Sequence, residues 1–113
     1  MSESFVISKI EKGKQVGGRV WSDIEGVTYY ESAGIQKWGE SYRVGIFKIA
    51  EENMAAEIFE INEVKEFSTL SGVIEYLKTN SPITFDSMNT LKGQKVFDPS
   101  VIYSETSVIY SEE

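Results

Sequence analysis

The sequence predicts a single α+β domain, in which a mainly antiparallel, twisted sheet of about five or six strands packs on one main helix at about residues 69–79. Three observations lead to this prediction. The chain has 113 residues, an ordinary length for one domain. Short runs rich in β-branched and aromatic residues alternate with turn-forming residues, as successive strands do. Only one segment shows clear helical periodicity, and its apolar stripe needs a flat surface to cover it.

The predicted helix, residues 69–79, carries its apolar side chains on one stripe. These residues recur at intervals of three or four, which places them on one side of a helix: Leu70, Val73, Ile74 and Leu77. Ser68 or Thr69 can cap the first turn by accepting a hydrogen bond from a free backbone N–H. Asn80 can end the helix in the left-handed conformation, and Pro82 prevents its continuation.

Two strands are predicted at the start of the chain. Residues 5–10 contain several β-branched side chains, and a polar turn separates them from residues 16–21, which form the return strand. Gly17 and Gly18 interrupt the return strand. We therefore expect a bulge, a bend or the close approach of another segment there.

Three further strands are expected before residue 50. Residues 26–31 and 35–38 are strand candidates, with a turn at residues 32–34 between them. Residues 42–49 have the strongest strand pattern, and their apolar side chains fall on both faces. A strand with two apolar faces is covered on both sides, so we place it at the centre of the sheet.

The segment before the helix has two interpretations. In the first, residues 50–55 connect two strands, and residues 56–61 form the second of them. In the second, residues 51–65 form a helix, because the composition of the connection favours one. Beyond the main helix we expect a helical turn opened by Thr84 or Asp86, and a short strand at residues 95–97.

The C-terminal part contains an internal repeat. Residues 100–105 and 107–112 both read Ser-Val-Ile-Tyr-Ser-Glu, with an offset of seven. In one flat strand an odd offset places the two copies on opposite faces of the sheet. We therefore expect the first copy to be a strand of a domain spanning residues 1–105, and residues 106–113 to be a flexible or partner-binding tail.

The composition argues against catalysis. The chain has no cysteine and no histidine, which removes thiolate chemistry and the usual acid–base group near neutral pH. We find neither a signal peptide nor an apolar run of the roughly 20 residues that a membrane span needs. We therefore expect a non-enzymatic, cytoplasmic protein that uses no cofactor or metal and does not bind membranes.

The charge is distributed unevenly along the chain, whose net charge is −7. Residues 1–48 hold seven basic and six acidic residues, a net charge of +1, whereas residues 49–113 hold four lysines and twelve acidic residues, a net charge of −8. Such an acidic half repels the phosphates of nucleic acids and attracts a basic protein.

The leading hypothesis is therefore an acidic protein that binds and inhibits a basic, nucleic-acid-handling partner, as immunity proteins, antitoxins and phage anti-defence proteins do. Complementary charge accelerates association with such a partner. The side chains expected in the interface are acidic residues near the helix and two tyrosines of the repeat: Glu51, Glu52, Glu57, Glu60, Glu63, Tyr103 and Tyr110.

Two alternatives stay open. The first is a small-ligand or nucleotide-binding module, in which Trp21 and Trp38 stack on the ligand and Arg43 supplies a positive charge. The second is a structural subunit of a homo-oligomer or hetero-oligomer, in which the C-terminal repeat adds a strand to a neighbouring sheet.

Overall fold

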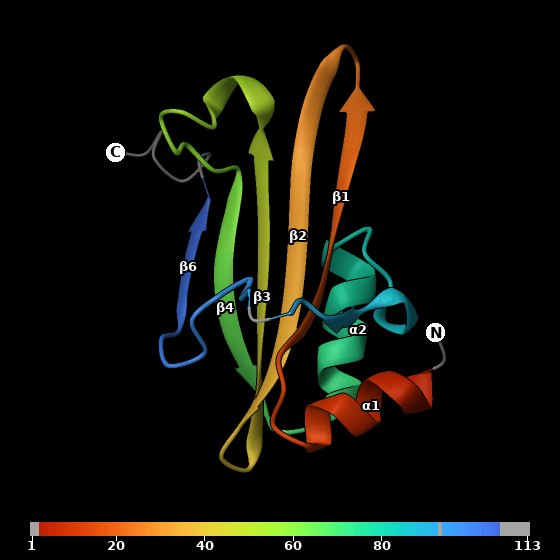
Figure 1. Ribbon diagram of the computed structural model, residues 1–113. Coiled ribbons are helices and arrows are strands. Elements are labelled where there is room, and N and C mark those ends of the chain that lie inside the picture. Colours follow the sequence, from red (N-terminus) through yellow and green to blue (C-terminus); the bar gives the residue numbers. More distant parts are fainter. Residues whose placement is uncertain (1–2, 93, 107–113) are drawn as a thin grey trace.

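Six strands form one antiparallel sheet in the order β5-β1-β2-β3-β4-β6, with two helices against it (Figure 1). The computed structural model describes residues 3–92 and 94–106, and for residues 103–106 it describes the backbone alone. The elements in chain order are α1 (Glu3–Glu11), β1 (Val16–Ile24), β2 (Val27–Trp38), β3 (Ser41–Ala50), the 3-10 turn η1 (Glu51–Asn53), β4 (Ile61–Phe67), α2 (Leu70–Asn80), the 3-10 turn η2 (Phe85–Ser87), β5 (Asn89–Thr90) and β6 (Tyr103–Thr106). The predicted α+β class is confirmed.

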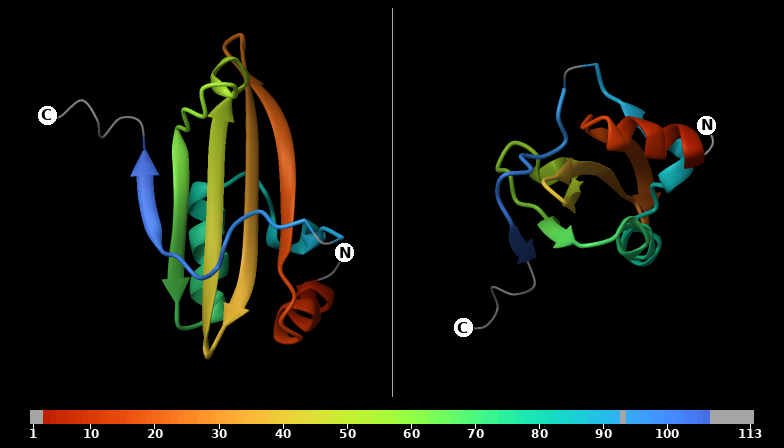
Figure 2. Two further views of the ribbon diagram at one scale, coloured as in Figure 1. Left: turned by 60° about the vertical axis from the view of Figure 1, so that its left-hand side comes forward. Right: turned by 90° about the horizontal axis from the view of Figure 1, so that it is seen from below.

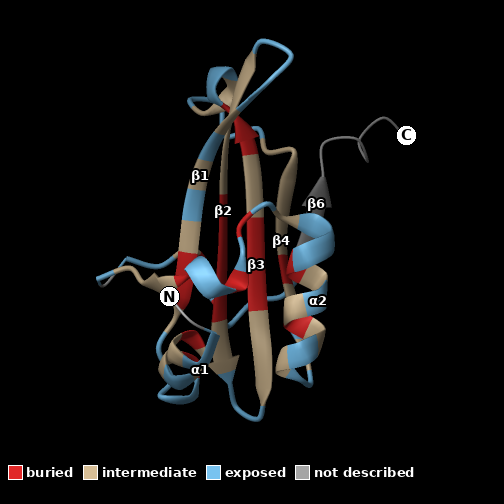
Figure 3. Cartoon of the chain, turned by 90° about the vertical axis from the view of Figure 1, so that its right-hand side faces the viewer, coloured by how far each residue is buried: buried red, intermediate tan, exposed pale blue. Residues whose placement is uncertain are grey.

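The main core lies between the sheet and the two helices, on the side that we call the helix face. Side chains of the three longest strands pack there against α1 and α2, and the following are almost fully buried: Val6, Ile10, Val16, Ala33, Ile35, Val44, Ile46, Val73 and Leu77. Figure 3 shows these buried positions concentrated where the strands pass beneath the helices. The apolar stripe predicted for residues 69–79 therefore covers the sheet, as expected.

α2 begins at its predicted cap and ends differently from the prediction. The hydroxyl of Thr69 accepts a hydrogen bond from the backbone N–H of Gly72, at 3.1 Å. At the other end, the backbone of Ser81 is extended and its N–H bonds to the carbonyl of Leu77. The left-handed ending predicted at Asn80 is wrong, because its side-chain amide instead donates back to the carbonyl of Tyr76.

An irregular segment, residues 94–99, crosses the opposite face of the sheet and leads to β6 (Figure 2). We call this segment the strap. It lies over a row of three glycines in register on neighbouring strands, Gly17, Gly34 and Gly45. A Cβ atom on Gly45 would lie 2.8 Å from Cγ of Phe97, so the bare backbone makes room for that ring. The close approach expected at the glycines of β1 is confirmed at Gly17.

Residues 5–10 form part of α1, so the strand predicted there is wrong. Val6 and Ile10 are four residues apart, which places both on the side of the helix that enters the core. The β-branched composition favoured a strand, but this burial outweighs that local preference.

Three other boundaries are corrected. Residues 32–34 lie inside the continuous strand β2 and form no turn. Residues 56–60 belong to the connection from β3, since β4 begins at Ile61, and the helix considered for residues 51–65 is absent. Residues 95–97 form no strand because they lie across the sheet as part of the strap. The turn expected near Thr84 is present as η2.

The first copy of the repeat forms a strand over part of its length, because β6 starts at Tyr103 and pairs with β4. β3 lies between β2 and β4 with cover on both faces, as its pattern predicted. The second copy of the repeat lies outside the described residues.

Candidate functional site

Two chain connections meet at the end of the sheet farthest from α1 (Figure 1). Glu25 and Gly26 join β1 to β2, and residues 51–60 join β3 to β4. In an antiparallel sheet every second connection returns to the same end, which explains why segments far apart in sequence meet here. Both turn residues of the first connection have positive φ angles, 51° at Glu25 and 85° at Gly26, as tight two-residue hairpins require.

Acidic side chains converge on this end of the molecule, which we call the acidic end. They are Asp23, Glu25, Glu31, Glu51, Glu52, Glu57 and Glu60. Of these, Asp23, Glu25, Glu51, Glu52 and Glu57 are exposed. The three exposed glutamates of the second connection were expected in an interface, whereas Asp23, Glu25 and Glu31 were not. The sequence indicates a turn near residue 25, but it does not show that this turn and Glu52 lie at the same end of the sheet.

The phenol of Tyr29 lies among these carboxylates. Partial burial raises the pKa of Tyr29, and the negative charges of Glu60, Glu52 and Glu25 raise it further. The ammonium of Lys48 lies 4.6 Å from the centre of the Tyr29 ring. Burial also raises the pKa of Glu31, which the charge of Lys48 partly offsets. This end therefore carries a concentrated negative potential.

Exposed apolar side chains share the acidic end. Trp21, Ile24 and Ile58 have exposed fractions of 53%, 46% and 49%. The ring of Trp21 packs on that of Tyr30 with centroids 4.9 Å apart, which restrains its orientation. A single exposed apolar residue is ordinary on a protein surface. Several at one end, beside a concentration of charge, are typical of an interaction surface.

Glu63 does not belong to the acidic end, although it was expected to act with the other glutamates. It lies on the helix face of β4, where the hydroxyl of Tyr76 donates to its Oε1 at 2.5 Å. Lys65 lies 3.8 Å from the same oxygen. Burial and this hydrogen bond raise the pKa of Tyr76 well above its ordinary value. Glu63 thus contributes to the contact between β4 and α2.

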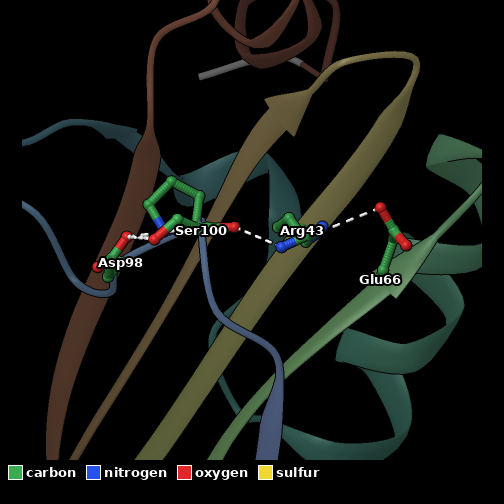
Figure 4. A network of polar contacts seen from close by, with 5 residues as sticks. Arg43, Glu66, Asp98 and Ser100 are labelled. Carbon is green, nitrogen blue, oxygen red and sulfur yellow. Dashed lines mark hydrogen bonds and ion pairs between the residues drawn. The ribbon is translucent and has the colours of Figure 1, made fainter.

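The three residues proposed for a small ligand do not form one site. Trp21 lies opposite Tyr30, and Trp38 is eight residues further along β2, a separation of about 26 Å at the usual rise per residue. Arg43 is also engaged: its guanidinium donates to the carbonyl of Pro99 and pairs with Glu66 at 3.1 Å (Figure 4). Arg43 therefore holds the strap on the sheet.

The side chains of the two tyrosines of the repeat, Tyr103 and Tyr110, lie outside the described part of the chain. The backbone of Tyr103 pairs with Val64 in β6. Tyr110 lies outside the described residues.

Within residues 3–92 and 94–106 the structure brings together no group of three or more Asp and Glu side chains suited to hold a metal ion. No helix in this part of the chain has the length and apolar character needed to cross a bilayer.

The fold and the acidic end define an α+β protein whose sheet ends in a charged surface with apolar side chains. Comparison with known proteins finds no family model that matches the chain, and no matching curated protein or solved structure.

Proposed function

We propose that the protein is a non-enzymatic inhibitor that binds a basic, nucleic-acid-handling partner protein through the acidic end. One observation carries the proposal: exposed apolar side chains and a surplus of carboxylates occupy the same end of the sheet. Proteins that handle nucleic acids have basic surfaces that contact phosphates. A matching acidic surface would occupy such a site in place of the nucleic acid.

Charge and apolar contact would act at different stages of binding. The carboxylates of Glu25, Glu52 and Glu57 would attract the partner over a distance and accelerate encounter. Trp21 and Ile58 would then be buried against it and slow dissociation, because buried aromatic and aliphatic anchors supply most of the binding energy in interfaces. The complex would therefore lose affinity as salt screens the charges.

The test is capture of a partner from native lysate, followed by binding kinetics with purified components and an assay of the partner's action on nucleic acid. The variant E25Q/E52Q/E57Q removes three exposed negative charges from the acidic end. We expect its association rate to fall roughly tenfold at low salt, with weaker inhibition of the partner. Trp21→Ala should chiefly accelerate dissociation.

The matched control is E3Q/E40Q/E75Q, which removes the same charge from exposed positions elsewhere. It should associate at nearly the wild-type rate. If both triple variants behave alike, or if binding does not change with salt, the acidic end is not the interface. A captured partner that still acts on nucleic acid when saturated with the protein contradicts inhibition.

A further inference from the structure

A cleft of about 390 Å³ opens on the sheet face opposite the helices, beside the strap. Its floor includes Arg19, Ser32, Phe47 and Asn62, which lie in register on four neighbouring strands, β1 to β4. The adjacent row on this face is the glycine row that the strap covers. The cleft therefore lies beside the strap on the same face of the sheet. Because the glycines let Val96 and Phe97 pack closely against the sheet, these two side chains form one wall of the cleft.

Aromatic rings form much of the remaining lining. Tyr30 stands on β2 with Trp21 packed on it, and Phe47 meets Phe59 of the β3–β4 connection edge to face, with centroids 6.3 Å apart. These contacts hold the rings in place before any ligand arrives. The volume is at the small end of the usual range for ligand pockets, which suits one or two fused rings.

The charge of the cleft is opposite to that of the protein as a whole. Arg19 and Lys95 are its two cations, and no acidic residue is among the described residues that line it, although the chain has a net charge of −7. Arg19 donates one hydrogen bond to the side-chain oxygen of Gln94. Among the described residues neither cation lies close enough to a carboxylate to form an ion pair, although the positive charge of Lys95 contributes to the lowered pKa of Asp98. The floor also offers the hydroxyl of Ser32, which is largely buried.

We propose that this cleft binds a small planar aromatic anion. The ring would pack between Tyr30 and the pair Phe47–Phe59, and its carboxylate would be held by Arg19 and Lys95. Cations without an ion-pair partner attract a negative charge, and an aromatic lining favours a flat apolar body. This site adjoins the acidic end, because Trp21 packs on Tyr30 of its lining and Phe59 belongs to the β3–β4 connection, but it does not depend on the function proposed for that end.

The test uses naphthalene-2-carboxylate and its neutral analogue naphthalene-2-carboxamide as probes, with binding to the ¹⁵N-labelled full chain followed by NMR. We expect the carboxylate to bind about tenfold more tightly than the carboxamide, with backbone shifts centred on residues 30–32, 47–49 and 95–97. Arg19→Gln and Lys95→Gln, both at exposed positions, should each weaken carboxylate binding about tenfold.

Lys12→Gln is the control, since it removes one positive charge from an exposed turn outside the cleft. It should leave the carboxylate affinity within about twofold of wild type. Equal affinity for the two probes, no shifts at millimolar probe, or shifts centred outside the cleft would each overturn the proposal. So would an effect of Lys12→Gln as large as that of Lys95→Gln.

Discussion

Gly45 is important because it has no side chain, which leaves room for the ring of Phe97. A Cβ atom there would lie 2.8 Å from Cγ and 3.0 Å from Cβ of Phe97, which are inner atoms that cannot swing away. The largely buried ring of Phe97 therefore depends on the bare backbone of β3. The same dependence recurs at Gly34, where an added Cβ would lie 3.0 Å from Cβ of Val96.

Gly45→Ala should destabilise the protein by about 1–3 kcal/mol, because the added methyl group forces the strap from the sheet. Urea denaturation measures this difference in the free energy of unfolding. Gly18→Ala is the control, since among the described residues the only close neighbour of its added Cβ is the methyl Cγ2 of Ile83. If Gly45→Ala lowers the free energy of unfolding no more than Gly18→Ala does, the strap does not pack closely against the glycine row.

Glu11 fastens the end of α1 to the sheet. Its carboxylate accepts hydrogen bonds from Nζ of Lys37 and from the hydroxyl of Tyr42, both at 2.8 Å. The bonds from Lys37 and Tyr42 lower the pKa of Glu11 below its ordinary value of 4.5. The unfolded chain thus binds this proton at a higher pH than the folded chain does. The resulting stabilisation of the folded protein is fully present above pH 4.5, and it is lost as the pH falls through the lowered pKa of Glu11.

Glu11→Gln should therefore lower the melting temperature at about pH 7 and have a smaller effect at about pH 3, where the wild-type carboxyl is increasingly protonated. Melting curves of both proteins across this range test the prediction. Glu75→Gln, at an exposed position on α2, controls for the loss of one charge. A destabilisation by Glu11→Gln that is the same at both pH values would exclude the ionic contact as its cause.

Among the elements, α2 is the one whose local sequence and tertiary role agree most closely. Its cap at Thr69 and its buried Val73 and Leu77 lie where the pattern predicted. The polar side of α2 carries no concentration of charge. We therefore assign the helix to the core and not to binding.

Leu77→Ala should destabilise the protein by about 2–5 kcal/mol, since it leaves a cavity between α2 and β3. The folded fraction should still bind the partner proposed above with unchanged specificity, because Leu77 is buried away from the surface. Chemical denaturation and binding kinetics on the same samples separate the two effects. Ser71→Ala should change the free energy of unfolding little, and a near-neutral Leu77→Ala would contradict the observed burial.

On the scale of the whole molecule, β6 covers an edge of the sheet. Residues 103–106 pair with Ile61–Val64 of β4, which would otherwise present unpaired backbone groups. Exposed strand edges pair readily with other chains. β6 thus replaces the seven-residue β4 as the edge strand with a strand of four residues, which offers less backbone for pairing with another chain.

Truncation after Ile102 should produce concentration-dependent self-association, which light scattering over a range of protein concentrations can measure. Truncation after Thr106 keeps β6 and is the control. If both truncated chains keep the oligomeric state of the full chain at all concentrations, edge protection by β6 is unimportant. If the full chain is an oligomer and truncation after Thr106 reduces the number of chains in it, the result would instead support the structural-subunit alternative.

The local pattern predicted the α+β class, the main helix, the central strand and the exposed glutamates at residues 51, 52 and 57. It misassigned α1, because a run of six residues that contains three β-branched side chains suits either a short strand or one face of a helix. It divided β2 at residues 32–34, because a glycine under a packed aromatic ring resembles a turn glycine in sequence.

By itself, the sequence determined which segments can form strands and a helix, and that the charge is negative, since these follow from residue types and spacings along the chain. Only the tertiary structure decided that Glu25 and Glu52 both lie near Tyr29, that Glu63 turns toward α2, and that Arg19 and Lys95 share an aromatic cleft. These arrangements depend on strand order and register. Antiparallel pairing sets which distant residues become neighbours, and no local spacing encodes it.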